Sequence, residues 1–228
     1  MAKKTDEKKG TAKKGGAKKP GKAKEVEVTV VGIGPGLLMD RMPEETLDAI
    51  RTRTTIRIDR GSMTEDEEAG GKVYRASDGQ TIAFPVENVL ACLKNGGRKV
   101  KIGRAAITKA TGETMLFSIL NVMTSDGFVP VTNGNGGPAT DDCWEVDKRK
   151  GSNNDNSANC LIRPKFPTWG MKFTVRIGPD GDEKIVKQLI EAAGMSAGMG
   201  SFRPKTGGPF GMFEIAEDGW NVTKTAAA

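Results

Sequence analysis

The chain has 228 residues, of which 36% are hydrophobic and 28% are charged, and its net charge is +6. This length is enough for one domain, or two small ones, with a real hydrophobic core. The sequence contains no histidine, which excludes a Ser-His-Asp triad, a Cys-His pair, a histidine-ligated zinc site and an imidazole general base.

The positive charge is concentrated at the N-terminus. Residues 1–24 carry ten lysines against Asp6 and Glu7, a net charge of +8, so the rest of the chain sums to −2. Because this segment lacks large apolar residues after Met1, we expect it to be a disordered tail. Such a tail neutralises phosphates without reading bases, which predicts salt-sensitive affinity for nucleic acid, and a solubilising tail is the alternative. A nucleic-acid site on the slightly acidic body must then be a local basic patch.

The N-terminal half of the body predicts strands and helices in alternation. Residues 25–31 alternate valine with polar residues, as in a half-buried strand. The turn at 32–36 is glycine-rich, but a Rossmann site is a weak alternative because leucine stands where the third glycine of that motif belongs. A helix is expected over 43–53, which opens with proline and two acids, and an acidic helical turn over 64–69. Asp78-Gly79 predicts a hairpin turn.

The central part of the chain gives less definite signals. Helical spacing of apolar residues predicts a short amphipathic helix over 86–95. The segments 100–107 and 114–123 are mixed, and the propensity of the second favours a strand. The runs 132–138 and 151–159 are rich in glycine and asparagine and predict loops, within an insertion over about 132–160 that carries contacts or is a tolerated surface insertion.

The C-terminal part is the most regular. Residues 143–149 are expected to be extended, and 171–177 alternate apolar with polar residues, which predicts a strand with a cationic outer face. An amphipathic helix over 185–193 is expected to end at Gly194, and a short apolar strand follows at 212–215. The membrane is not an expected partner, because the longest near-apolar stretch is too short to span it and no signal peptide is recognised.

The segment 194–211, between this helix and this strand, holds six glycines. Glycines let a backbone approach another chain closely and turn N–H groups outward, which suits phosphate contact. Phe202, Arg203 and Lys205 add stacking and charge.

The helix, the glycine-rich segment with its Phe210-Gly211-Met212-Phe213 ending, and the last strand resemble the C-terminal signature of the repeat-associated mysterious proteins (RAMPs). These are the ferredoxin-like subunits that line the RNA in CRISPR effector complexes. The resemblance also includes, loosely, the first strand. It implies an α+β, ferredoxin-like (RRM/RAMP-like) antiparallel sheet with helices on one face, as a single domain over 25–222 with a C-terminal tail at 223–228. The composition and plan also look like proteins of tailed phages.

The resemblance implies a role for the loop. Family members that cleave RNA commonly use histidine, so the non-catalytic backbone subunits, which bind and stack along RNA, are the better comparison. Arg203 and Lys205 would contact phosphate. The glycines that would shape the loop against the nucleic-acid backbone are Gly198, Gly200, Gly207, Gly208 and Gly211.

Two further basic clusters are candidates for the same site. The first interleaves cations with rings and consists of Arg163, Lys165, Phe166, Trp169 and Lys172, with Arg176 further along the same strand. The second consists of Lys148, Arg149 and Lys150. Stacking on aromatic rings is worth about 1 to 3 kcal/mol per base and accepts any base, so this mixture suits single strands. In the alternative interpretation the two rings belong to the core and the cations to a solvated face.

The leading hypothesis is therefore a non-catalytic protein that binds single-stranded RNA or DNA, without cofactor or metal, and assembles side by side. The alternatives are a phage structural or assembly protein, and a mimic of a CRISPR backbone subunit that binds protein partners. An enzyme that holds magnesium on converging acids is the least favoured, with Asp40, Asp59, Asp141 and Asp142 as the candidate ligands. Three cysteines without a C-x-x-C pair indicate a reducing, cytoplasmic setting, in a prokaryote or a phage-infected host cell.

Overall fold

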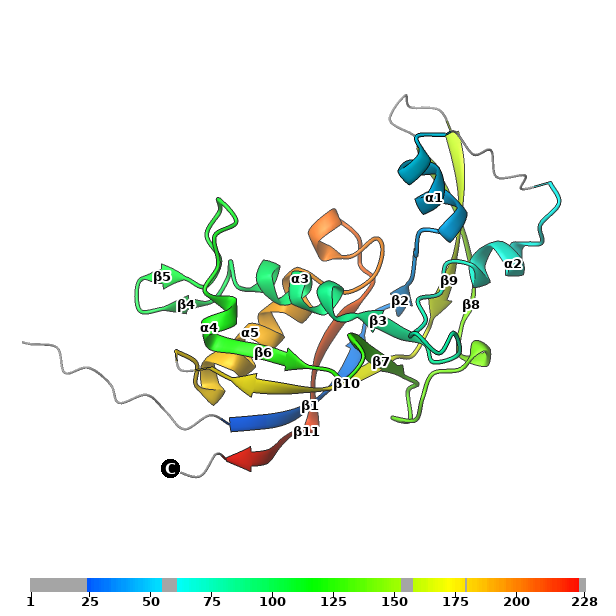
Figure 1. Ribbon diagram of the computed structural model, residues 1–228. Coiled ribbons are helices and arrows are strands. Elements are labelled where there is room, and N and C mark those ends of the chain that lie inside the picture. Colours follow the sequence, from blue (N-terminus) through cyan, green and yellow to red (C-terminus); the bar gives the residue numbers. More distant parts are fainter. Residues whose placement is uncertain (1–23, 55–60, 153–157, 179, 226–228) are drawn as a thin grey trace, which may run out of the picture.

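The computed structural model describes residues 24–54, 61–152, 158–178 and 180–225 (Figure 1). Of the predicted N-terminal tail only Lys24 is among them, as the first residue of a strand, and the other tail residues lie outside the described part of the chain. The middle of the predicted loop 151–159 also lies outside it.

An antiparallel sheet forms the centre of the molecule. Its long strands are β1 (Lys24–Ile33), β10 (Gly170–Ile177) and β11 (Met212–Thr225). Its short strands are β3 (Ala83–Pro85), β6 (Leu120–Met123) and β7 (Phe128–Thr132). β1 lies between β11 and β10, and β10 pairs on its other edge with both β6 and β7. β3 extends the sheet beyond β7.

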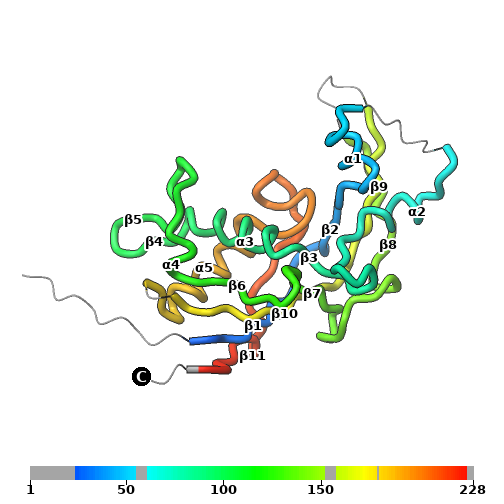
Figure 2. Tube along the Cα trace, in the orientation of Figure 1, coloured from blue at the N-terminus to red at the C-terminus, as the bar shows by residue number. Residues whose placement is uncertain are grey.

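The order of the elements defines a ferredoxin-like fold, which confirms the predicted fold class. The chain runs β1, α3 (Val86–Gly96), β6, β10, α5 (Glu183–Ser196) and β11, and these four strands lie in the order β11-β1-β10-β6. The two helices pack against each other and cover the same face of the sheet (Figures 1 and 2). The other face of the sheet is not covered by a helix in the described part of the chain.

Alternation along the strands creates the core. The three valines of β1 are fully buried, and β10 buries every second side chain beside them. The core residues of these strands and of α5 are Val26, Val28, Val30, Met171, Phe173, Val175, Ile177, Val186, Leu189, Ile190 and Ala193. The helix starts where the side chain of Asp182 accepts a hydrogen bond from the Ile185 N–H, over 2.8 Å.

A second, three-stranded sheet extends to one side of the ferredoxin-like unit. It consists of β2 (Leu37–Leu38), β9 (Ala158–Phe166) and β8 (Glu145–Ser152), all antiparallel. Helices α1 (Glu44–Thr52) and α2 (Glu65–Gly70) lie on this side (Figure 1). Thr64 and Glu67 form a reciprocal capping box at the start of α2.

Several boundaries differ from those predicted. Within the insertion over 132–160, the segment 143–149 was expected to be extended and falls mostly in β8, after a 3₁₀ turn at Asp141–Cys143. β8 runs on to Ser152 and β9 begins at Ala158, so the predicted loop 151–159 is partly a hairpin. The segment 114–123 begins with a helical turn, α4 (Leu116–Ile119), before β6. The segment 100–107 forms the small hairpin of β4 (Lys101–Ile102) and β5 (Ala105–Ala106).

The last helix and strand are longer than expected. α5 continues through Gly194 to Ser196, and a Cβ at Gly194 would lie 1.9 Å from the carbonyl oxygen of Phe213. This glycine therefore permits contact between α5 and β11 and does not end the helix. β11 reaches Thr225, inside the predicted C-terminal tail. Among the described residues, no helix is both long and apolar enough to cross a membrane.

Candidate nucleic-acid interface

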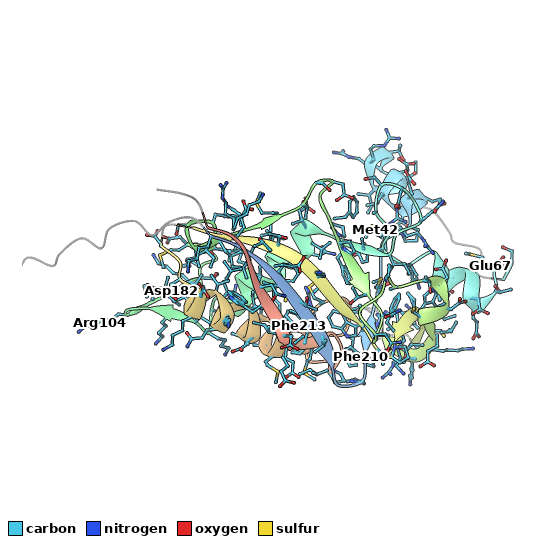
Figure 3. All side chains as sticks on the ribbon, turned by 90° about the horizontal axis from the view of Figure 1, so that it is seen from below. Met42, Glu67, Arg104, Asp182, Phe210 and Phe213 are labelled. Atoms are coloured by element: carbon cyan, nitrogen blue, oxygen red, sulfur yellow. The ribbon has the colours of Figure 1, made fainter. Side chains whose placement is uncertain are left out.

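A groove of about 470 Å³ separates the β8–β9 hairpin from the glycine-rich loop, which we define as residues 197–211. The residues that line this groove are Arg149, Lys150, Gly151, Leu161, Arg163, Gly200, Ser201, Phe202, Arg203 and Thr206. Phe210, at the end of the loop, lies where the main sheet meets the hairpin (Figure 3). Cations from two predicted clusters, Lys148–Lys150 and Arg163–Lys172, therefore meet the glycine-rich loop.

Backbone hydrogen bonds fix the glycine-rich loop to the first part of the chain. The Ser201 N–H donates to the Leu38 carbonyl over 2.7 Å, and the Gly211 N–H donates to the Gly36 carbonyl over 2.8 Å. A third bond of 2.8 Å, from the Met199 N–H to the Gly211 carbonyl, closes the base of the loop. One wall of the groove is thus held in place by β2 and the turn before it.

The glycines of the loop serve its own packing. A Cβ at Gly200 would lie 2.2 Å from the Leu38 carbonyl oxygen, and one at Gly208 would lie 1.9 Å from that of Phe202. At Gly198 it would meet the Pro204 ring at 2.7 Å. Contacts within their own chain thus already require these glycines, and their close approach to nucleic acid stays a prediction. Gly207 differs, with a φ of +82° and no atom within 4 Å of its Cβ position.

Arg149 on β8 is held between a carboxylate and a ring. Its Nε donates to both carboxylate oxygens of Asp147 over 2.8 Å. Its guanidinium carbon lies 4.7 Å from the centre of the buried Phe210 ring, a cation–π distance. The hydrogen bond to Asp147 raises the pKa of Arg149 above its usual value. The guanidinium is therefore charged and oriented at the edge of the groove.

Arg163 and Arg203 enter the groove from opposite walls. Arg163 on β9 donates from Nε to Asp40 Oδ2 over 3.0 Å. Arg203 donates from Nη1 to the Gly198 carbonyl, over 3.3 Å, within its own loop. A smaller cavity of about 230 Å³ is lined by Asp40 and, like the groove, by Arg203. Because Asp40 and Asp147 offset two of the groove's cations, the local potential is positive but moderate.

The two predicted stacking rings belong to the core, as the alternative interpretation had it. Phe166 is fully buried and Trp169 nearly so. Trp169 packs edge-on against Phe213, with ring centres 6.1 Å apart, and a Cβ at Gly32 would meet its indole at 2.1 Å. Neither ring can stack on a base without unfolding the core, so the ring exposed at this groove is Phe202.

Other predicted cations lie elsewhere. Lys172 and Arg176 project from β10 on the sheet face that the helices do not cover, with Lys172 paired to Glu27 over 2.9 Å and Arg176 3.9 Å from Glu25. The structure therefore separates them from the groove. Lys148, Lys165 and Lys205 are also not among the groove's lining residues.

Those three lysines lie elsewhere on the β8–β9 hairpin and on the glycine-rich loop. Lys148 pairs with Glu65 of α2, and Lys165 pairs over 2.7 Å with Glu145, its cross-strand neighbour. Lys205 is exposed on the 3₁₀ turn Pro204–Thr206 of the glycine-rich loop.

The acids weighed as magnesium ligands that the structure describes form no metal-binding cluster. Asp40 pairs with Arg163, Asp141 pairs with Arg75 over 2.6 Å, and Asp59 lies outside the described residues. Within the described ranges, no group of three or more His, Cys, Asp or Glu side chains is placed to hold a metal ion.

No protein-family model matches the chain, and no curated protein matches it. Among solved structures, it is similar to a chain in the cryo-EM structure of the Type III-B Cmr-beta complex bound to cognate target RNA, with a TM-score of 0.40 and 14% sequence identity. The alignment covers 90% of this chain and 62% of that chain. The strand order and pairing of this chain define its ferredoxin-like fold.

Proposed function

We propose that this protein binds single-stranded nucleic acid without catalysing a reaction. The sugar-phosphate backbone of the bound strand lies in the groove between the β8–β9 hairpin and the glycine-rich loop. The main observation behind the proposal is that three arginines line one groove. They are Arg149 on β8, Arg163 on β9 and Arg203 on the glycine-rich loop. Guanidinium groups suit this task because their planar fork binds phosphate oxygens in pairs.

Phe202 supports a single strand over a duplex. Phe202 is 41% exposed and lines the groove, and its ring centre lies 6.1 Å from that of the buried Phe210, with the two ring planes tilted by 35°. An unpaired base can stack on such a ring, whereas the bases of a duplex are already stacked on each other. Bases of any identity fit, so we expect little sequence preference.

The electrostatics of the groove predict strong salt dependence. Asp40 and Asp147 offset Arg163 and Arg149, so binding depends on replacing these internal pairs and on releasing counterions from phosphate. The Lys-rich residues 1–23 would add sequence-independent affinity without defining the path of the strand. The resemblance of the C-terminal segment to the RAMP backbone subunits agrees with binding that needs no catalytic group.

Fluorescence anisotropy with a labelled single-stranded oligonucleotide tests the proposal. At about 50 mM salt we expect binding that weakens steeply as salt rises. Replacing Arg149 and Arg203 together by alanine should weaken it roughly tenfold or more, because each arginine both pairs with a phosphate and displaces counterions from it. Lys172→Ala is the matched control on the uncovered sheet face and should bind like the unmodified chain.

Two results would contradict the proposal. One is no binding at about 50 mM salt, where electrostatic affinity is strong. The other is an equal loss in the Lys172→Ala control and in the double variant, which would move the site to the open face of the sheet. Removal of residues 1–23 should lower the affinity without abolishing it, because the groove remains.

A further inference from the structure

A second basic surface lies away from the groove. Residues 98–112, which include the β4–β5 hairpin, contain five lysines and arginines, no acid and no aromatic residue. We define residues 98–104 as the basic segment, and its cations, all exposed, are Arg98, Lys99, Lys101 and Arg104. Figure 3 shows Arg104 at one extreme of the molecule, away from Phe210 at the end of the glycine-rich loop. The basic segment is therefore separate from the groove.

The core holds the hairpin in place. Val100 and Ile107 at its base are buried, and the Ile107 N–H donates to the Val100 carbonyl over 3.0 Å. The Thr108 N–H donates to the Gly97 carbonyl at the end of α3, over 3.1 Å. At the tip, Gly103 has a φ of +61°, which suits a two-residue hairpin turn, and no atom lies within 4 Å of its Cβ position. The hairpin is thus a fixed ribbon that projects from the body (Figure 1).

The charges of the basic segment are available to a partner. None of its four cations forms an ion pair with another described residue, and the next cation along the chain, Lys109, pairs with Glu113 over 2.8 Å. Figure 3 shows Asp182 on the same side of the molecule, but the side chain of this acid caps α5. In the groove, by contrast, aspartates pair with two of the arginines.

The Lys-rich residues 1–23 join the body on the same side. They contain nine lysines against two acids. β1 begins at Lys24, whose ion pair with Glu183 over 2.6 Å places it beside the start of α5, where Figure 3 shows Asp182. Two basic stretches that are far apart in the sequence therefore meet the body on one side.

The chemistry of the basic segment favours duplex nucleic acid as the partner. Because residues 98–112 offer no ring for a base to stack on, affinity must come from phosphates, and a duplex carries about one negative charge per 1.7 Å of its axis. A two-stranded β-ribbon also fits the major groove, which is about 12 Å wide. An anionic membrane suits the hairpin less well, because its Gly103-Arg104 tip has no large apolar side chain to insert.

We propose that the basic segment is a second nucleic-acid site, which binds the phosphates of a duplex without reading its sequence. Arg104 at the tip enters a groove of the duplex, while Arg98, Lys99 and Lys101 contact the flanking phosphates, and residues 1–23 extend this contact. The site does not depend on the single-strand groove. Because the two sites are separate, one molecule holds a duplex and a single strand at the same time, as in a nucleic acid with paired and unpaired parts.

Fluorescence anisotropy of the full chain with a labelled, blunt-ended duplex of about 20 base pairs tests the site. At about 50 mM salt we expect binding that weakens as salt rises. Replacing Lys101 and Arg104 together by alanine should weaken it roughly tenfold. The slope of log affinity against log salt should fall by about two, because each lost phosphate contact releases one counterion fewer.

The matched control removes one lysine and one arginine from elsewhere on the surface. Lys172→Ala combined with Arg176→Ala changes the net charge equally, on the uncovered sheet face, and should bind the duplex like the unmodified chain. Circular dichroism should show that both double variants are folded.

Two further variants separate this site from the groove and from base stacking. The groove variant, with Arg149 and Arg203 replaced by alanine, should bind the duplex normally although it loses affinity for a single strand. Phe117→Ala removes a ring on α4 that is 58% exposed, and it should also leave duplex binding unchanged, because the bases of a duplex are already stacked on each other. Failure of one nucleic-acid site therefore leaves the other site testable.

The proposal is overturned if no duplex binding is detected at about 50 mM salt. It is equally overturned if the hairpin variant and its matched control lose the same affinity, or if the duplex is lost in the groove variant and kept in the hairpin variant. A loss in Phe117→Ala as large as that in the hairpin variant would identify stacking instead of phosphate contact. Binding of anionic vesicles or of an acidic peptide, without binding of the duplex, would also reject nucleic acid as the partner.

Discussion

Arg163 donates from Nε to Asp40 Oδ2 over 3.0 Å and so connects β9 to the segment that follows β2. The Arg163 side chain is only 13% exposed, whereas that of Asp40 is 39% exposed. The guanidinium thus faces the groove with part of its charge neutralised by its own chain. Asp40 therefore competes with a bound phosphate for the positive charge of Arg163.

Asp40→Asn should therefore strengthen binding. The substitution removes a negative charge at the groove while keeping the shape of the side chain, and we expect the affinity for a single-stranded oligonucleotide to rise about threefold at low salt. The loss in the free energy of unfolding should be below about 1 kcal/mol, because the pair is partly exposed to solvent. Anisotropy titrations and urea denaturation measure the two effects. Weaker binding would mean that Asp40 positions Arg163 for the strand instead of competing for it.

Phe202→Ala should weaken binding by removing the exposed stacking ring. A stacked base is worth about 1 to 3 kcal/mol, which corresponds to a loss of roughly five- to a hundredfold in affinity. The salt dependence should not change, since the variant keeps every cation. Met195→Ala, which truncates an exposed apolar side chain on α5, is the control and should bind normally. An unchanged affinity for Phe202→Ala would exclude stacking at this position.

The regular elements of the ferredoxin-like unit were predictable from local patterns. The valines of β1 alternate with polar residues, and the apolar positions of α5 follow helical spacing, so each element's buried face is encoded locally. The strand order is not encoded in this way, because it depends on contacts between β1 and strands far along the chain. The strand order was predicted only because the C-terminal segment resembles that of the RAMPs, which implies a ferredoxin-like sheet.

The site was predictable only in part. Interleaved rings and cations fit a binding surface as well as a half-buried strand, and in β9 the second interpretation holds, with Phe166 inward and Lys165 partly exposed. A glycine that approaches its own chain, such as Gly200, cannot be distinguished in sequence from one that approaches a ligand. Asp147 was foreseeable, since residues two apart in a strand share a face with Arg149. The pairing of Asp40 with Arg163 could not be predicted, because nothing in the sequence near Asp40 indicates a contact with β9.

Two glycines of the loop separate steric from conformational effects on stability. Gly200 and Gly207 both have positive φ, but only Gly200 is crowded, with its Cβ position 2.2 Å from the Leu38 carbonyl oxygen. Gly207→Ala should cost about 1 to 2 kcal/mol, the strain of a left-handed residue. Gly200→Ala should cost clearly more, because β2 and the loop must also move apart. Denaturant unfolding of the two variants measures the difference, and equal costs would contradict the close contact.

Glu183 should contribute to stability in a pH-dependent way. The hydrogen bond from Lys24, 2.6 Å long, is the main cause that lowers the pKa of Glu183 below its ordinary value of 4.5. A carboxyl with a lowered native pKa stabilises the fold above its ordinary pKa, and this contribution is lost as the pH falls through the native pKa. Glu183→Gln should lower the free energy of unfolding by less than about 1 kcal/mol at neutral pH, because the pair is partly exposed.

The same difference should vanish in acid. Denaturation curves of both chains, collected from neutral pH to below the lowered native pKa of Glu183, should converge at the low end. A difference that stays constant with pH would mean that the Gln substitution acts through packing against Trp220, which donates to Glu183 over 3.3 Å, and not through charge.

Photocrosslinking tests most directly where the strand lies. A single-stranded oligonucleotide with photoreactive pyrimidines, irradiated in complex with the full chain and analysed by peptide mass spectrometry, should attach to the peptide that contains Phe202. The Phe202→Ala chain should lose this adduct. Adducts confined to residues 1–23 or to the β10 peptide that contains Lys172 and Arg176 would contradict the groove as the binding site.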